Sequence, residues 1–204
     1  MTEELADKAK AERVRQFVFF STMSVYGMTM GQITEETECT PITFYGKSKL
    51  AAERYLCEQR SDTFKVAVIR PPMIYGKACT GNYASLEKLA GKIPVFPRVS
   101  NERSMIYIEN LCEFLYRIIR GDADGIYCPQ NSQYVNTSEN PPLHTPPPLP
   151  GFEWIIGKLA GRVNIFSKVF GSLTYDRKLS FPEEEGEYEV VDFLESIKKS
   201  KESL

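Results

Sequence analysis

The sequence predicts an α/β fold built on a parallel sheet, with a small α+β lobe beside it. Residues 15–21 and 64–70 are short runs of aromatic and β-branched residues bounded by charge, which is typical of buried strands. Residues 44–58 between them have helical spacing, with an apolar stripe of Leu50, Ala51, Leu56 and Cys57. Strand, helix and strand in this order predict a right-handed βαβ unit.

The remaining elements follow from local pattern. We expect helices over residues 2–13, 82–90, 110–120 and 190–199, and a strand at 126–128. Residues 140–150 hold so many prolines that no helix can form there, so this stretch is expected to be a loop. These patterns divide the chain into a sheet-containing part at 1–139, a Pro-rich loop at 140–151 and a helical remainder at 152–204.

The chemistry of the chain is expected around Tyr45 and Lys49. Residues four apart on a helix share a face, so this phenol and this ammonium are predicted neighbours. A free tyrosine titrates near ~10 and is a poor base at neutral pH, but a nearby cation favours the phenolate. Ser21 and Thr22 lie at the C-terminal end of the first strand, at the edge where ligands bind in open α/β sheets. This arrangement suits proton transfer to or from an alcohol while a cofactor takes the hydride.

Several motifs in order resemble the extended short-chain dehydrogenase/reductases, and among them the NAD-dependent epimerase/dehydratases that include UDP-glucose 4-epimerase. The resemblance covers residues 12–139 well and returns weakly near residues 169–175. Its motifs are Phe19-Phe-Ser-Thr-Met-Ser-Val-Tyr-Gly27, Tyr45-Gly-Lys-Ser-Lys49, Ala51-Ala-Glu53, Arg70-Pro-Pro-Met-Ile-Tyr-Gly76 and Arg103-Ser-Met-Ile-Tyr-Ile-Glu-Asn-Leu111. It implies a partial Rossmann-like sheet and a substrate-binding lobe.

The resemblance also implies catalytic and binding roles. Tyr45 would be the acid/base, and Lys49 would hold the nicotinamide ribose and favour the tyrosinate. Thr22 would hydrogen-bond the reacting sugar hydroxyl, and Ser21 would lie near the cofactor. Arg103 would contact the substrate diphosphate, because a planar guanidinium binds phosphate oxygens bidentately.

The loop after the second predicted strand would lie against the nicotinamide through Pro71, Pro72 and Met73. Two departures from the family pattern bear on the substrate. Met23 and Ser24 stand where the family's dehydratases have Asp-Glu, so 4,6-dehydration is not expected. Met73 stands where many nucleotide-sugar epimerases have Asn, which leaves the sugar nucleotide open.

A Gly-rich turn after a strand, which a dinucleotide fold needs for the cofactor pyrophosphate, is missing from the sequence. In the family this turn lies roughly a hundred residues before the tyrosine helix, and here about forty residues precede it. We therefore expect a family member that lacks its N-terminal cofactor half. A truncated gene product, a fragment and a piece completed by another polypeptide all fit this expectation.

The composition and charge limit the classes of partner that the chain is expected to bind. The chain has 204 residues, 42% of them apolar and 25% charged, with a net charge of −2. These values fit a globular protein and give no electrostatic case for nucleic acid or an anionic membrane. With no signal peptide, no apolar run of membrane-spanning length and five scattered cysteines, we expect a cytoplasmic protein with reduced thiols and no metal site.

The leading functional hypothesis is an epimerase-type oxidoreduction on a nucleotide sugar with NAD, in a chain that is incomplete as it stands. The sequence does not decide whether the cofactor is NAD or NADP. One alternative is an NAD(P)-dependent carbonyl reductase, and another is a catalytically silent remnant or interaction protein. The family's tyrosine helix commonly contributes to dimers, so a homodimer is also an expectation.

Overall fold

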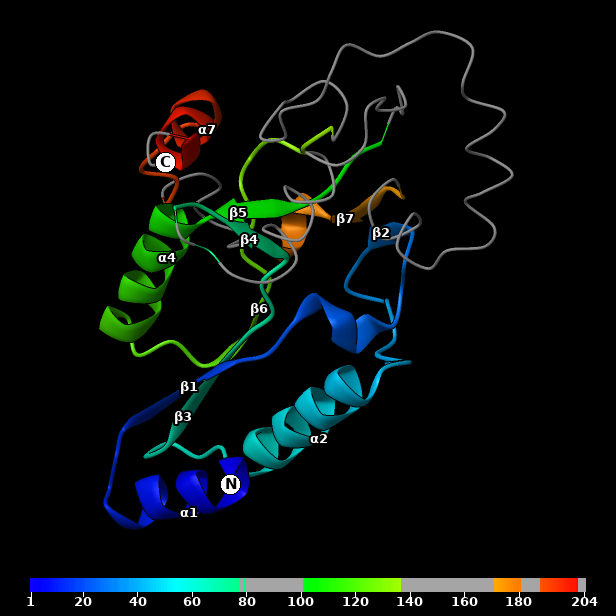
Figure 1. Cartoon of the computed structure of the whole chain (residues 1–204). Helices are drawn as coiled ribbons and strands as arrows, with labels where there is room; N and C mark the ends of the chain where they lie inside the picture. The colour runs from blue at the N-terminus through cyan, green and yellow to red at the C-terminus, as the bar shows by residue number, and fades with distance from the viewer. Residues whose placement is uncertain (78, 80–100, 137–170, 181–187, 202–204) are drawn as a thin grey trace, which may run out of the picture.

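The structure, a computed structural model, describes residues 1–77, 79, 101–136, 171–180 and 188–201. Its principal sheet contains three parallel strands in the order β1-β3-β6, as Figure 1 shows. The bounds of these strands are Gln16–Phe20 for β1, Lys65–Ile69 for β3 and Gly125–Tyr127 for β6. The α/β class, the parallel sheet and each of these three strands are confirmed.

Helix α2, Phe44–Glu58, has the bounds expected from the sequence. Thr43 caps its N-terminus, because the Thr43 Oγ1 accepts a hydrogen bond from the Gly46 N–H at 3.0 Å. Its buried face, however, consists of Gly46, Leu50, Glu53 and Leu56. The expected stripe was wrong at Ala51, which is exposed, and Cys57 is only half-buried. The buried face of α2 instead includes Glu53, whose burial depends on an ion-pair partner that residue spacing alone does not reveal.

The helices cover both faces of the sheet. Helix α1, Thr2–Ala11, and α2 lie on one face, and α4, Ile108–Arg120, lies on the other (Figure 1). Alternate residues of β3 point to opposite faces. One core cluster comprises Ala6, Phe19, Leu56, Phe64, Val66 and Val68, and the other includes Ala67, Ile69, Leu111, Phe114 and Ile118. Each fully buried aliphatic or aromatic side chain of this kind stabilises a fold by roughly 1.5–3 kcal/mol.

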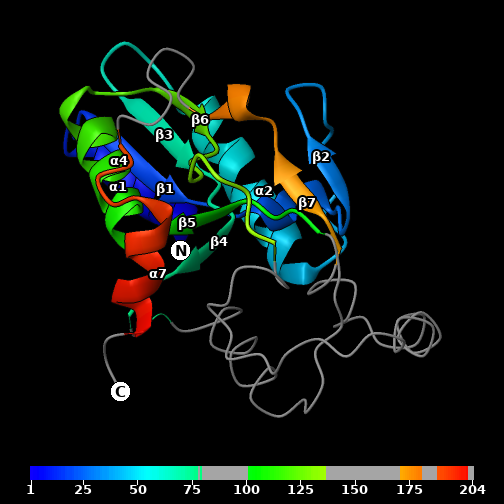
Figure 2. The same ribbon diagram turned by 90° about the horizontal axis from the view of Figure 1, so that it is seen from above.

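A lobe of two short parallel pairs continues from the sheet. Strand β4, Met73–Tyr75, pairs with β5, Met105–Tyr107, and β2, Gly31–Ile33, pairs with β7, Leu173–Tyr175. Figure 2 shows β2 and β7 side by side at the end of the molecule away from α1 and α4. The sequence pattern did not reveal these four strands, because three residues are too few to establish a period.

The C-terminal helix α7, Phe193–Lys201, lies close to the expected 190–199. It is fixed to the lobe by a hydrogen bond of 2.6 Å between the Tyr75 and Ser196 hydroxyls, both buried. The expected helix at 82–90, the Pro-rich loop at 140–151 and the segment from 152 to 170 lie outside the described residues.

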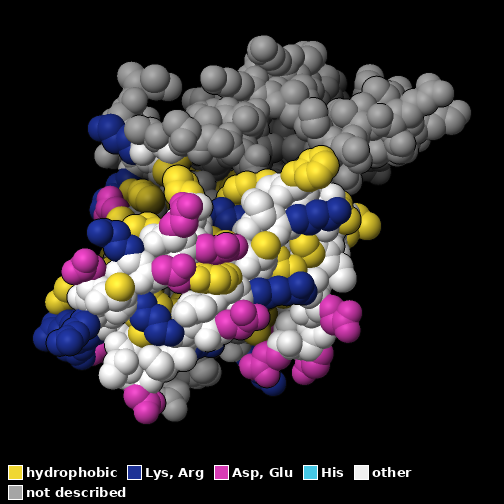
Figure 3. All heavy atoms as spheres, turned by 90° about the horizontal axis from the view of Figure 1, so that it is seen from below, with side chains coloured by type: hydrophobic (Ala, Val, Ile, Leu, Met, Phe, Trp, Pro, Cys, Tyr) yellow, Lys and Arg dark blue, Asp and Glu magenta, His cyan; other side chains and the backbone are white. Residues whose placement is uncertain are grey.

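The surface shown in Figure 3 intersperses acidic and basic side chains with hydrophobic ones. In the described part of the chain, no helix is both long and apolar enough to cross a membrane. The same residues contain no group of three or more His, Cys, Asp or Glu arranged to hold a metal ion.

Candidate active site

Tyr45 and Lys49 lie on the first two turns of α2, on the side that faces the carboxyl end of β1. The Lys49 Nζ donates a hydrogen bond of 2.6 Å to the carbonyl of Phe20, the last residue of β1. The same ammonium lies 5.9 Å from the centroid of the Tyr45 ring and 4.8 Å from that of Phe19. The Tyr45 side chain is 56% exposed. The strand end therefore holds the cation beside a phenol that solvent or a ligand can reach.

Gly46, between these two residues, allows α2 to approach the loop after β1. A Cβ at this position would lie 2.7 Å from the Ser24 carbonyl oxygen and 3.0 Å from the Pro41 Cβ. Only a glycine fits this approach without displacing the backbone of residue 24. The glycine thus allows α2 to pack on the 3-10 helix η1, Met23–Tyr26.

Ser21 and Thr22 come directly after β1, and their hydroxyls lie in different environments. Ser21 is 5% exposed, and its Oγ has no hydrogen-bond partner, whereas its N–H donates to the Ile69 carbonyl at 2.7 Å. Thr22 caps η1, since its Oγ1 accepts from the Ser24 N–H at 3.2 Å. It also donates to the Ser24 Oγ at 3.3 Å, a long hydrogen bond. A buried hydroxyl without a partner is unusual, because burial of an unpaired polar group costs about 1–3 kcal/mol.

The turn after β3 lies next to this loop. The Pro71 carbonyl accepts a hydrogen bond of 3.2 Å from the Met23 N–H, and Pro71 and Pro72 are both buried. Met73 is half-buried and begins β4, where it pairs with Met105. The structure therefore brings together the ends of β1 and β3 with the first turns of α2.

A buried ion pair beneath this site was not foreseen from the sequence, although both of its residues lie in the quoted motifs. Arg70 is only 7% exposed and Glu53 only 2%. The Nε and Nη2 of Arg70 donate hydrogen bonds to the two carboxylate oxygens of Glu53. Burial alone would lower the pKa of Arg70, but the hydrogen bonds that it donates to the Glu53 carboxylate raise it overall. The pair joins the middle of α2 to the carboxyl end of β3.

The ion pair extends into a hydrogen-bonded network. The Arg70 Nη1 donates to the Tyr26 hydroxyl at 2.8 Å, and the Arg70 carbonyl accepts from the Tyr175 hydroxyl at 2.9 Å. Burial raises the pKa of both tyrosines, and both are protonated at neutral pH. The signal that could have revealed this network is the pairing of a helical Glu with an Arg at a strand end, since neither charge is buried alone.

Arg103 lies in the lobe, apart from the Tyr45 group. Its backbone bridges Val135 and Leu173, and its Nη1 donates to the Gly171 carbonyl at 2.8 Å. No carboxylate among the described residues pairs with it, and burial lowers the pKa of its guanidinium. The structure thus holds a half-buried cation with no counter-charge among the described residues.

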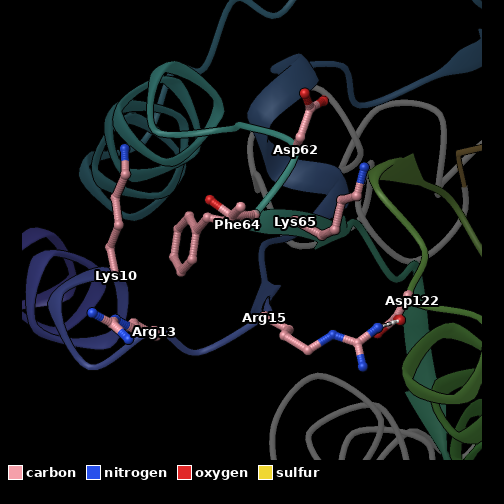
Figure 4. Close-up of a pocket in the computed structure, with 8 residues that line it drawn as sticks. Lys10, Arg13, Arg15, Asp62, Phe64, Lys65 and Asp122 are labelled. Carbon is pink, nitrogen blue, oxygen red and sulfur yellow. Dashed lines mark hydrogen bonds and ion pairs between the residues drawn. The ribbon is translucent and has the colours of Figure 1, made fainter.

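A cavity of about 500 Å³ lies at the opposite, amino edge of the sheet. Figure 4 shows Lys10 and Arg13 at the end of α1, Phe64 and Lys65 at the start of β3, and Arg15 reaching toward Asp122. None of the sequence-predicted site residues lines this cavity. Ligands of open parallel sheets bind at the carboxyl edge, so the candidate active site is the group around Tyr45.

The parallel sheet and the group at its carboxyl edge define an α/β protein of the Rossmann-like class. The family model of the NAD dependent epimerase/dehydratase family matches residues 1–127. The chain therefore belongs to this family of enzymes, as the sequence motifs predicted.

Relatives of known name agree with this assignment. The chain is 28% identical over 194 residues to UDP-glucose 4-epimerase of Vibrio cholerae, a match that covers 86% of this chain and 59% of that enzyme. It is 33% identical to N-acetyl-alpha-D-glucosaminyl-diphospho-ditrans,octacis-undecaprenol 4-epimerase of Escherichia coli O157:H7, over 55% of this chain and 35% of the relative. The chain thus spans at most about three-fifths of the length of these curated relatives.

Solved structures show the same fold. UDP-glucuronic acid 4-epimerase from Bacillus cereus, in complex with NAD, superposes with a TM-score of 0.64 at 15% identity. The superposition covers 98% of this chain and 64% of that one. MoeE5 in complex with UDP-glucose and NAD gives a TM-score of 0.62 at 17% identity.

Proposed function

We propose that this chain supplies the proton-transfer and substrate-binding part of an NAD-dependent nucleotide-sugar 4-epimerase. The observation that carries the proposal is the Lys49 ammonium, held by the Phe20 carbonyl beside the accessible Tyr45 phenol. Membership of an NAD-dependent family and likeness to two curated 4-epimerases support it.

The residues at the strand ends fit a nicotinamide cofactor. The unpartnered Ser21 hydroxyl supports a polar ligand at this point, because a group outside the chain would supply its missing partner. Lys49 uses one of its three N–H donors on Phe20, which leaves two for ribose hydroxyls. Pro71, Pro72 and Met73 would form the apolar wall on which the nicotinamide lies. Bound there, NAD would accept and return the hydride.

Tyr45 would accept the proton of the sugar C4 hydroxyl as the phenolate, and would return it when the alcohol re-forms. Lys49 would keep a positive charge 5.9 Å from the Tyr45 ring centroid during the transfer. Thr22 would orient the same sugar hydroxyl by exchanging its long hydrogen bond to Ser24 for one to the substrate. Arg103 would bind the diphosphate, which would relieve the cost of a guanidinium half-buried without a counter-charge.

A second candidate is an NAD(P)-dependent carbonyl reductase that uses the same Tyr45 and Lys49. The observation that favours it is Met73, a half-buried thioether where an amide would bind the sugar nucleotide. The two activities differ in their net use of cofactor, because epimerisation consumes none and reduction consumes NADH or NADPH in proportion to product.

The test is carried out on the purified chain at high NAD concentration, because the missing Gly-rich turn predicts weak cofactor binding. UDP-glucose is supplied, and the formation of UDP-galactose and of NADH is followed. We expect slow interconversion without net NADH, abolished by Tyr45→Phe. Tyr116→Phe is the matched control, because Tyr116 is a 53% exposed tyrosine on α4.

Three other outcomes would change the assignment. Net oxidation of NADH with a carbonyl substrate would identify the reductase. Retained epimerisation in Tyr45→Phe would remove Tyr45 from the mechanism. A folded chain that neither alters NADH fluorescence nor converts UDP-sugars would have no catalytic function on its own.

A further inference from the structure

The cavity at the amino edge of the sheet carries an excess of positive charge. Its volume is about 500 Å³, and six of the side chains that line it are ionisable. Four are cations and two are carboxylates: Lys10, Arg13, Arg15, Lys65, Asp62 and Asp122. Four positive and two negative charges leave an excess of two, although the whole chain has a net charge of −2. The cavity is therefore opposite in sign to the chain as a whole, which favours an anionic ligand.

Only one cation of the cavity is paired with a carboxylate of the described residues. Arg15 forms an ion pair with Asp122 (Figure 4). The Lys10 Nζ donates to the backbone carbonyl and the side-chain oxygen of Gln59 at 3.0 and 3.1 Å, and both acceptors are neutral. Within the described ranges, none of the three other cations takes part in an ion pair. Three positive charges therefore line the cavity, with Asp62 as the one carboxylate of its lining that is not already paired.

The structure of α1 does not explain why an arginine stands at position 13. A cation near the end of a helix can bind the last carbonyls, but three of these are already bonded. The carbonyls of residues 8, 9 and 10 accept hydrogen bonds of 2.9–3.1 Å from the backbone N–H groups of residues 12–14. Arg13 itself has φ of 59°, a left-handed conformation that glycine adopts at lower cost. A charged side chain thus stands where the backbone favours glycine, and a bound anion would account for it.

The cavity is built on rigid elements. Lys65 is the first residue of β3, and its N–H donates to the Arg15 carbonyl at 2.8 Å, which holds these two basic residues on neighbouring strand ends. Phe64 lines the cavity although it is only 1% exposed, and its ring centroid lies 6.0 Å from the Lys10 Nζ. Figure 4 shows this ring directed toward the end of α1. An anion above so apolar a floor is partly removed from water, where its attraction to cations is stronger.

We propose that this cavity binds the phosphate group of a small phosphomonoester. Such an ester carries about 1.5 to 2 negative charges at pH 7, which matches the excess of two in the lining. The planar guanidinium of Arg13 can bind two phosphate oxygens at once, and Lys10 and Lys65 add point charges. A volume of about 500 Å³ lies within the range of cavities that bind small organic ligands, so the organic group would fit beside the phosphate. The site lies at the sheet edge opposite Tyr45 and does not depend on the chemistry proposed there.

The test measures the binding of three phosphomonoesters of increasing size to the full chain: glycerol 3-phosphate, glucose 6-phosphate and AMP. Calorimetry gives the affinity, and the NMR chemical shifts of backbone amides locate the site. We expect at least one ester to bind saturably and to shift the amides of Arg13, Thr63 and Lys65. Glycerol, glucose and adenosine lack the phosphate and should not shift them. Glucose 6-sulfate carries a single negative charge, and we expect it to bind several-fold more weakly than glucose 6-phosphate.

Arg13→Gly separates loss of binding from loss of folding. Glycine relieves the left-handed backbone, so this variant should melt at a higher temperature, yet we expect it to bind the ester at least about tenfold more weakly. Arg13→Lys keeps the charge and should lose less affinity, whereas Lys65→Gln should weaken binding. Arg54→Gln is the matched control, because Arg54 is an exposed arginine on α2 that does not line the cavity. It should leave the affinity unchanged.

Several results would overturn the proposal. The absence of saturable binding for all three esters would refute it, and shifts confined to residues around Tyr45 or Arg103 would place the phosphate elsewhere. Equal affinity for inorganic phosphate and for every ester would leave no role for an organic group. Equal effects of Lys65→Gln and Arg54→Gln would mean unspecific attraction, and tighter binding of a short oligothymidylate would make a nucleic acid the occupant. Tyr45→Phe should bind the esters normally, so failure of the proposed chemistry and failure of this site can be told apart.

Discussion

Gly46→Ala tests whether the close approach of α2 to the loop after β1 is required. In a helix interior, Ala is more favourable than Gly by about 1 kcal/mol. Here the new Cβ would lie 2.7 Å from the Ser24 oxygen and 3.0 Å from the Pro41 Cβ. Ordinary carbon–oxygen contacts are about 3.3 Å or longer, so the helix must move by roughly 0.6 Å. Overpacking of this kind costs about 1–3 kcal/mol.

The contribution of helix propensity to the change in stability can be subtracted by making the same Gly-to-Ala exchange at the next residue. Lys47 is exposed on the same turn, so Lys47→Gly and Lys47→Ala together measure the effect of Gly-to-Ala exchange without a steric clash. We expect Ala to stabilise the chain by about 1 kcal/mol at position 47 and to destabilise it by about 1 kcal/mol at position 46. The difference between the two sites, about 2 kcal/mol, is the cost of the clash.

Urea unfolding followed by circular dichroism measures the free energy of unfolding for these variants. If Ala stabilises the chain equally at both positions, the contact with Ser24 is not rigid, and the assigned role of Gly46 is wrong. If the clash is real, the displaced first turn of α2 should also weaken any binding that depends on Tyr45.

Three further predictions concern the buried charge, the end of α1 and alkaline pH. Glu53→Gln should lower the free energy of unfolding by about 3 kcal/mol, because Arg70 is then buried without a counter-charge, whereas Glu113→Gln at a half-exposed helix pair should change it by less than about 0.5 kcal/mol. Arg13 has φ of 59° at the end of α1, so Arg13→Gly should stabilise the chain by about 1 kcal/mol and Arg13→Ala should not; equal melting temperatures would contradict this. Burial raises the pKa of Tyr75 to about 12, so the unfolded state loses this proton first above pH ~10 and stability falls by up to about 1.4 kcal/mol per pH unit between the two values. A melting temperature that stays constant between pH 9 and 11 would refute that linkage.

The βαβ unit was predictable from the sequence because its elements are long enough to show a period. The runs at 15–21 and 64–70 are continuous apolar stretches of strand length, and the segment at 44–58 repeats apolar residues at helical spacing. The motif around Tyr45 and Lys49 was likewise local, so helical geometry alone made them neighbours. Their roles stay predictions until activity is measured.

The lobe and the buried network were not predictable by the same reasoning. Strands such as β2 and β7 have three residues each, and their pairing joins segments far apart in the chain. Glu53 has the spacing of an apolar residue on α2 but not its chemistry, and only the position of Arg70 explains its burial. Gly46 belongs to the Tyr45–Lys49 motif, but its steric role was not predictable, because a close backbone approach leaves no periodic signal in the sequence.

The pairing of β2 with β7 has a consequence for the order in which the chain folds. Gly31 pairs with Leu173, so 142 residues separate the two partners, by subtraction of their numbers. During synthesis at about 5–20 residues per second, β2 would wait roughly 7–30 s before its partner exists. Closing so long a loop also costs entropy before any contact forms, which slows this step further. The pairing of β1 with β3 needs only the first 70 residues, so the ribosome delivers α2 with its two flanking strands well before β7 completes the lobe.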